Sequence, residues 1–178
     1  MRSLIDPENI LRNVGIAKGM AVADLGCGQG FFTIPIASIV GTEGKVYAVD
    51  SDPVALDYLR EGMKGNNVGE NVIEIMQTNM SSTGIPDHSI DAIFLANVFH
   101  DIEDRAAFFG EAKRICKPGG MLIDVDWEKV NTARGPPFKL RIPVEEAKEI
   151  LSGNGFKVVK SIEAGQNHYG FVCRLVSK

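Results

Sequence analysis

The chain has 178 residues and 44% hydrophobic content, enough for one sizeable core, so we expect a single domain over residues 1–178. A net charge of −4 provides no basic field for a phosphate backbone, which makes nucleic acid an unlikely partner. No apolar run reaches the 18 residues of a membrane span, and acids stand near the N-terminus where a signal peptide has its apolar core.

Cysteine usage bears on the compartment. Cys27, Cys116 and Cys173 lie far apart and show no C-x-x-C spacing, which argues against a disulfide framework or a zinc cluster. We therefore expect reduced, separate thiols and a cytoplasmic location.

The first predicted element is a helix over residues 6–14. Asp6 is a suitable N-cap, and Pro7 suits the first helical position. Residues 1–20 would then form an N-terminal cap helix and a lead-in to the first strand.

A glycine-rich loop follows the first predicted strand. The sequence Val-Ala-Asp-Leu-Gly-Cys-Gly-Gln-Gly (residues 22–30) breaks an apolar strand with three glycines, and a helix-compatible run begins at Phe31. Glycine permits positive φ and lacks a Cβ, so such a loop can present its amides to a ligand. A dinucleotide site would have its third glycine at residue 31, and Asp24 would repel a pyrophosphate while attracting an ammonium group.

The segment Asp-Leu-Gly-Cys-Gly-Gln-Gly resembles the first motif of the class I S-adenosylmethionine-dependent methyltransferases. The resemblance implies S-adenosyl-L-methionine as cofactor and S-adenosyl-L-homocysteine as product. It implies cofactor contacts at Asp24, Gly26, Cys27, Gly28 and Gly30.

The second predicted strand, residues 45–50, ends in an acid twenty residues beyond Gly30. Parallel strands place their carboxyl ends at one edge, where ligands of open α/β sheets bind, so the Asp50 carboxylate can accept both hydroxyls of a ribose. Ser51 is a further cofactor contact by the same resemblance. Asp52 and Pro53 are typical of a helix start and are assigned a structural role, at the head of a helix over residues 54–63.

The third predicted strand, residues 72–76, leads to Asn79 and Met80. The family usually has an acid or amide here that faces the adenine amine. Asn79 can accept that hydrogen bond through its carbonyl, although Asp is more common in the family, and Met80 can pack on the ring. A plain loop asparagine is the alternative.

The fourth predicted strand, residues 92–96, is followed by Asn-Val-Phe-His-Asp-Ile-Glu-Asp. This resembles the fourth motif of the small-molecule branch that contains quinone-biosynthesis C-methyltransferases, and it implies that Asn97 faces the methionine part of the cofactor. His100 is the candidate general base because imidazole titrates near neutral pH, with Asp101 beside it. Alternatively, His100 hydrogen-bonds to Asp101 or Asp104 and only fixes the loop.

The remaining elements are a helix over 104–116, a Lys-Pro-Gly-Gly turn, a strand over 121–127, a helix over 143–152 and two closing strands over 156–162 and 169–176. Asp124 and Asp126 alternate, so both carboxylates should lie on one face of their strand. The further ligands of a metal-dependent methyltransferase are not evident, and we expect no metal. The long irregular segment 128–142 is predicted to be an acceptor lid.

Seven strands that alternate with helices until the last two predict an α/β fold, a Rossmann-like doubly wound seven-stranded sheet, mostly parallel with an antiparallel edge strand. The leading hypothesis is in-line methyl transfer to a small molecule, which requires mainly that a nucleophile be held close to the methyl group. A protein or tRNA acceptor, a non-catalytic S-adenosylmethionine-binding partner subunit and a nicotinamide dehydrogenase are the alternatives. The glycine spacing disfavours the dehydrogenase. Monomer and homodimer are both open.

Overall fold

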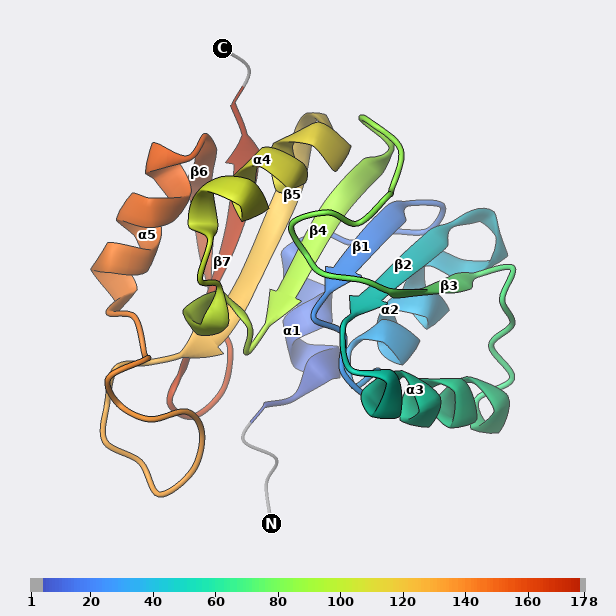
Figure 1. The fold of residues 1–178 in the computed structure, drawn as a ribbon, viewed down its shortest axis with the longest axis horizontal. Coiled ribbons are helices and arrows are strands. Elements are labelled where there is room, and N and C mark those ends of the chain that lie inside the picture. Colours follow the sequence, from blue (N-terminus) through green and yellow to red (C-terminus); the bar gives the residue numbers. More distant parts are fainter. Residues whose placement is uncertain (1–4, 177–178) are drawn as a thin grey trace.

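The computed structural model describes residues 5–176, so the first four residues of the predicted lead-in lie outside the described part. These residues form a seven-stranded sheet with helices on both faces (Figure 1). The strands are β1 (Ala21–Leu25), β2 (Lys45–Asp50), β3 (Ile73–Gln77), β4 (Ile90–Ala96), β5 (Cys116–Trp127), β6 (Phe156–Glu163) and β7 (His168–Leu175). The helices are α1 (Pro7–Val14), α2 (Thr33–Val40), α3 (Pro53–Gly65), α4 (Arg105–Ile115) and α5 (Val144–Gly153), with 3-10 turns η1 (Gly41–Glu43) and η2 (Phe99–Asp101).

The strand order is β3-β2-β1-β4-β5-β7-β6. The first five strands in this order are parallel, and β7 is antiparallel to both β5 and β6. The predicted fold class is therefore confirmed. The antiparallel strand lies second from the edge because the chain turns back after β6 and inserts β7 between β6 and β5.

The order reverses between β1 and β4. From β1 the chain moves outward to β2 and β3, and then it returns to the other side of β1 as β4. In open α/β sheets the crevice outside the carboxyl ends of such strands is where ligands bind. The carboxyl ends of the parallel strands form the lower edge of the sheet in Figure 1, beside the start of α3 and the loop after β5.

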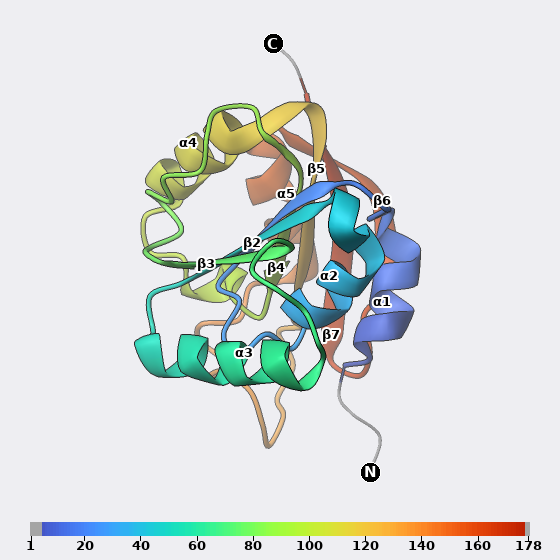
Figure 2. The same cartoon turned by 90° about the vertical axis from the view of Figure 1, so that its right-hand side faces the viewer.

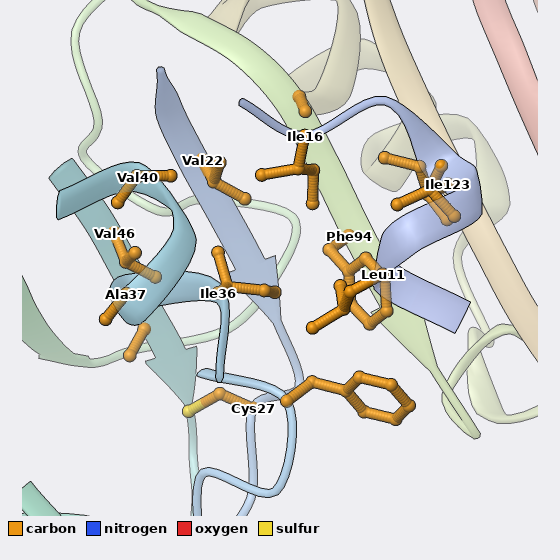
Figure 3. Packing of buried hydrophobic residues seen from close by; sticks show 14 of the residues in the cluster. Leu11, Ile16, Val22, Cys27, Ile36, Ala37, Val40, Val46, Phe94 and Ile123 are labelled. Atoms are coloured by element: carbon orange, nitrogen blue, oxygen red, sulfur yellow. The ribbon is translucent and has the colours of Figure 1, made fainter. Parts of the chain in front are cut away.

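Two helical layers bury the sheet. Apolar residues of α1, α2 and α3 pack on one face, and those of α4 and α5 pack on the other. Figure 2 shows α4 on one side of the strands and α1 and α2 on the other. On the first face Val22 and Val46 lie against α2, and Leu11 of α1 lies by Phe94 and Ile123 (Figure 3).

One local prediction differs from the structure. The Lys-Pro-Gly-Gly turn, residues 117–120, lies within β5 as a bulge, because Ile90 pairs with Cys116 and Ala92 with Met121. Positive φ at Gly119 (72°) allows the extra residues to loop out before pairing resumes. Within residues 5–176, no helix has the length and apolar character needed to cross a membrane.

Candidate functional site

The glycine loop connects β1 to α2 at the carboxyl edge of the sheet. Gly26, Gly28 and Gly30 all have positive φ, between 53° and 87°, and the amides of Gly26 and Cys27 donate to the Val49 carbonyl at 2.8 and 3.0 Å. A Cβ at Gly26 would lie 2.6 Å from Val98, whereas a Cβ at Gly28 would meet nothing within 4 Å. The loop is therefore tied to β2, with open space beside Gly28.

Asp50 joins this loop to the start of α3. Its Oδ2 accepts from the Gly28 amide at 2.8 Å, and its Oδ1 accepts from the Asp52 amide at 2.9 Å. A carboxylate has about four acceptor positions, so both oxygens keep capacity for further donors. Thus the acid and the glycine loop, predicted separately from the sequence, are in direct contact. Ser51 is exposed next to them.

Asp24 is buried at the end of β1, with 2% of its surface exposed. Its Oδ2 accepts from the Thr33 hydroxyl at 2.6 Å. Burial raises the pKa of Asp24 to about 7, the Thr33 bond opposes this rise, and the charge of Asp50 adds to it. The carboxyl group therefore changes charge near neutral pH. The neighbouring Cys27 side chain is also buried, and burial raises the pKa of its thiol.

Asn97 follows β4 in the left-handed conformation, with φ of 58°. Its amide donates to the Val125 carbonyl at 2.8 Å, which ties it to β5. Its side-chain Oδ1 is buried and has no hydrogen-bond partner within the described part of the chain. Since buried polar atoms are almost always paired, this acceptor indicates a position where a ligand donor can bind.

Asn79 and Met80 lie after β3, on the far side of β2. The Asn79 Oδ1 already accepts from the Ser81 amide at 2.9 Å, and the residue is exposed. Met80 is partly buried against the core on the α4 and α5 face. The Asn79 oxygen that was expected to accept from the adenine amine thus already closes a local turn. One of its lone pairs remains for another donor.

His100 lies in η2 and contacts an acid that the sequence analysis did not pair with it. Its Nδ1 lies 2.7 and 3.0 Å from the two oxygens of Asp126 on β5, and its backbone amide donates to Asp126 Oδ2 at 2.9 Å. Asp101, one of the two expected partners, lies 3.3 Å from Nε2. Asp104, the other, caps α4 by accepting from the Ala107 amide.

The charges around His100 decide its protonation. Burial lowers the pKa of the ring, but the hydrogen bond and charge of Asp126 and the charge of Asp101 outweigh this, so the pKa is raised. Asp124 lies on the same face of β5 as Asp126, as the alternation predicts, and is fully buried. Burial, with the charge of Asp126, raises the pKa of Asp124 well above its usual range.

The segment 128–142 is irregular, as predicted, but a buried arginine organises it. Arg141 is 3% exposed and donates five hydrogen bonds within the segment, to the carbonyls of Pro136, Glu128, Val130 and Arg134 and to the Thr132 hydroxyl. Its guanidinium also lies 4.9 Å from the centre of the Trp127 ring. The sequence analysis missed this role, because the side chain binds backbone carbonyls that no motif specifies.

Two surface hollows lie elsewhere. One of about 790 Å³ lies between α3 and β3, and another of about 580 Å³ lies between α1 and α2. Neither is lined by Asp50 or His100, so the candidate site is defined by the side chains at the strand ends. In the described part of the chain no three His, Cys, Asp or Glu residues are arranged to hold a metal ion.

Comparison with known proteins identifies the family of the chain. A family model described as a methyltransferase domain matches residues 23–124. A crystal structure of an S-adenosylmethionine-dependent methyltransferase from Aquifex aeolicus is 32% identical, covers 97% of this chain and 91% of its own, and superposes with a TM-score of 0.90.

Two curated relatives are named for quinone biosynthesis. A demethylmenaquinone methyltransferase of Geobacillus kaustophilus is 28% identical over 116 residues, which are 65% of this chain and 49% of that protein. A ubiquinone/menaquinone biosynthesis C-methyltransferase of Hahella chejuensis is 30% identical over 115 residues, which are 65% and 46%. The chain spans about half the length of these curated relatives.

Proposed function

The chain belongs to the methyltransferase-domain family, and from this premise we propose that it transfers a methyl group from S-adenosyl-L-methionine to a small molecule. The observation that supports the proposal is the contact between the Asp50 carboxylate and the Gly28 amide, because the acid that we propose for the ribose lies against an open glycine loop. S-adenosylmethionine bound there would supply a methyl group that is electrophilic because it is attached to a sulfonium.

The residues at the strand ends fit this cofactor. Asp50 would accept the ribose hydroxyls, with Ser51 at the rim. The unpartnered Asn97 Oδ1 and the Asp24 carboxylate are acceptors suited to the ammonium of the amino acid end. The backbone of residues 26–30 would follow the ligand between them, and Asn79 with Met80 would border the adenine.

The acceptor would approach from the side of η2 and segment 128–142. The names of the curated relatives make the ring carbon of a quinone-type molecule the first acceptor to test. We keep segment 128–142 as the proposed acceptor lid, and His100, with Asp101 beside it, as the proposed catalytic residue. We further propose that residues 1–178 form one domain and that the protein is cytoplasmic. We also propose that it is a monomer or homodimer and does not bind nucleic acid.

Transfer of a radioactive methyl group tests this function. Purified protein with methyl-labelled cofactor and 1,4-naphthalenediol, a reduced quinone, should yield a labelled organic product. Asp50→Ala should abolish labelling at low cofactor concentration. Cofactor binding without transfer to any of a panel of small acceptors, peptides and tRNA would instead indicate a non-catalytic partner subunit, and binding of NAD in its place would indicate a dehydrogenase.

A further inference from the structure

We propose that His100 accepts the proton that the methyl acceptor loses, and that Asp126 is the positioning residue that fixes the tautomer of His100. The proposal rests on the proposed function, since it concerns the acceptor side of the same site. It names a chemical class of acceptor, one whose nucleophilic atom carries a hydrogen at neutral pH.

Asp126 is held by three N–H groups. The backbone amides of His100 and Trp127 donate to it at 2.9 and 2.6 Å, and His100 Nδ1 lies 2.7 Å from Oδ1. Its side chain is 1% exposed. A carboxylate only accepts hydrogen bonds, so Nδ1 carries the ring hydrogen and the lone pair of the neutral ring is on Nε2.

The Nε2 atom lies beside the exposed Asp101. It lies 3.3 Å from Asp101 Oδ2, and the Asp101 side chain is 62% exposed, whereas the His100 side chain is 5% exposed. An exposed carboxylate can swing aside without disturbing buried packing, whereas Asp126 cannot. An acceptor can therefore replace Asp101 at Nε2 while Asp126 keeps the ring in place.

Asp124 provides an internal contrast on the same strand face. Both of its oxygens are buried and lack a hydrogen-bond partner among residues 5–176, unlike those of Asp126. A buried carboxyl group without donors is most stable when neutral. Of the two acids on this face of β5, Asp126 is thus the one whose negative charge can balance an imidazolium. Asp124 is a neutral neighbour, so asparagine is a close replacement for it.

The step balances as follows. The electron pair of the acceptor atom forms a bond to the methyl carbon, the bond from that carbon to the sulfonium sulfur breaks, and its electron pair stays on sulfur as a thioether. The proton of the acceptor atom moves to His100 Nε2, opposite the negative charge of Asp126. Hydroxyl groups and activated ring or enol carbons meet this requirement, while thioethers and tertiary amines have no proton to lose.

Three variants separate these roles. His100→Asn retains an amide hydrogen for Asp126 but lacks Nε2, Asp126→Asn removes the charge, and Asp124→Asn is the matched control. The first readout is NMR of the imidazole nitrogens. The neutral His100 ring should carry its hydrogen on Nδ1 in the wild type and in Asp124→Asn, and Asp126→Asn should lose this tautomer and lower the pKa.

The second readout is single-turnover methyl transfer to 1,4-naphthalenediol across pH, with cofactor affinity measured separately. His100→Asn should slow transfer about 10²- to 10⁴-fold without changing cofactor affinity. The rate of the wild type should rise as pH increases through the pKa of His100. The charged groups that act on the ring are Asp126, Asp101 and Arg141, so Asp126→Asn should move this rise to lower pH and lower its plateau.

Several outcomes would overturn the proposal. These are a neutral wild-type ring protonated on Nε2, full transfer by His100→Asn, or equal effects of Asp124→Asn and Asp126→Asn. Cofactor binding without methylation of the quinol would overturn the acceptor class. Absence of cofactor binding would instead refute the proposed function, and the NMR readout would still decide the His100 tautomer.

Discussion

At the scale of single residues, two neighbouring acids after β2 hold different parts of the structure together. Asp50 accepts from the Gly28 amide of the glycine loop, and Asp52 accepts from the Val54 amide in the first turn of α3. The sequence separated these roles because Asp52 precedes a proline at the first helical position while Asp50 ends a buried strand. The same separation allows a paired mutational test.

Asp50→Ala should weaken S-adenosylhomocysteine binding by about 1.5–3 kcal/mol, the range for hydrogen bonds to a charged group. Asp52→Ala should leave binding unchanged and lower the free energy of unfolding by about 1 kcal/mol, as expected for a lost helix cap. Titration calorimetry and urea denaturation measure the two effects. Equal affinity of Asp50→Ala and wild type would remove Asp50 from the site.

We expect Asp24 to make cofactor binding pH-dependent. Its pKa of about 7, raised by burial, means that the group is partly protonated in the free protein at neutral pH. A ligand ammonium favours the ionised form and lowers this pKa, so affinity should rise as pH increases through about 7, with proton release on binding. Calorimetry in buffers of different ionisation enthalpy measures the release. Asp24→Asn should abolish it, and identical wild-type heats in all buffers would contradict the assignment.

The contact that sequence reasoning missed at the site, between His100 and Asp126, shows where such reasoning stops. His100 and the alternating acids Asp124 and Asp126 were each identified from the sequence, but the pairing of His100 with Asp126 was not. It depends on the adjacency of β4 and β5, and on the turn of η2 that aims Nδ1 at the neighbouring strand. Local sequence favoured Asp101 and Asp104 as partners of His100 because they are close to it in the chain.

At the scale of elements, caps and strand ends were predictable because their signals are local. Asp6 and Asp52, predicted to begin helices, each accept from amides in the first turn of a helix. The bulge at residues 117–120 was not predictable from the sequence. The same glycines suit a turn that ends strand pairing and a bulge that only interrupts it. Only the pairing of β4 with both sides of this segment distinguishes the two.

Segment 128–142 was predictable as a loop but not in its internal order, which Arg141 provides. Arg141→Ala removes five hydrogen bonds from a buried, charged donor, and we expect the segment to open locally. A loss of about 1.5–3 kcal/mol corresponds to roughly 10- to 150-fold faster cleavage by a protease limited by local opening. Limited proteolysis with mass spectrometry locates the cuts.

Two variants control this experiment. Arg134→Ala removes an exposed side chain from the same segment and should leave cleavage unchanged. Arg141→Lys keeps the charge but cannot match a planar fork of donors, so it should resemble Arg141→Ala. Protection of the segment in Arg141→Ala would show that packing holds it instead, such as the close approach of Gly135 to the Trp127 ring, where an added Cβ would lie 2.7 Å from the ring.

At the scale of the whole molecule, the sheet brings sequence-distant signals to one edge. The glycine loop, Asp50, Asn97 and His100 follow β1, β2 and β4, and the strand order places these three strands side by side. The rule that parallel strands share a carboxyl edge made this grouping predictable. The depth of Asp24 was not predictable, because burial depends on how α2 covers the end of β1.

Cofactor choice is the property of the whole molecule that a single measurement decides. A ligand that binds only the folded state at 100 times its dissociation constant stabilises it by about 2.7 kcal/mol. For a domain of this size, 1 kcal/mol raises the melting temperature by roughly 2–4 °C, so S-adenosylhomocysteine should raise it by about 5–11 °C. NAD should produce no shift, because residue 31 is Phe where a dinucleotide loop needs its third glycine. Asp50→Ala should reduce the shift with S-adenosylhomocysteine, since it removes the acceptor proposed for the ribose hydroxyls. A shift of the melting temperature with NAD and none with S-adenosylhomocysteine would refute the cofactor assignment.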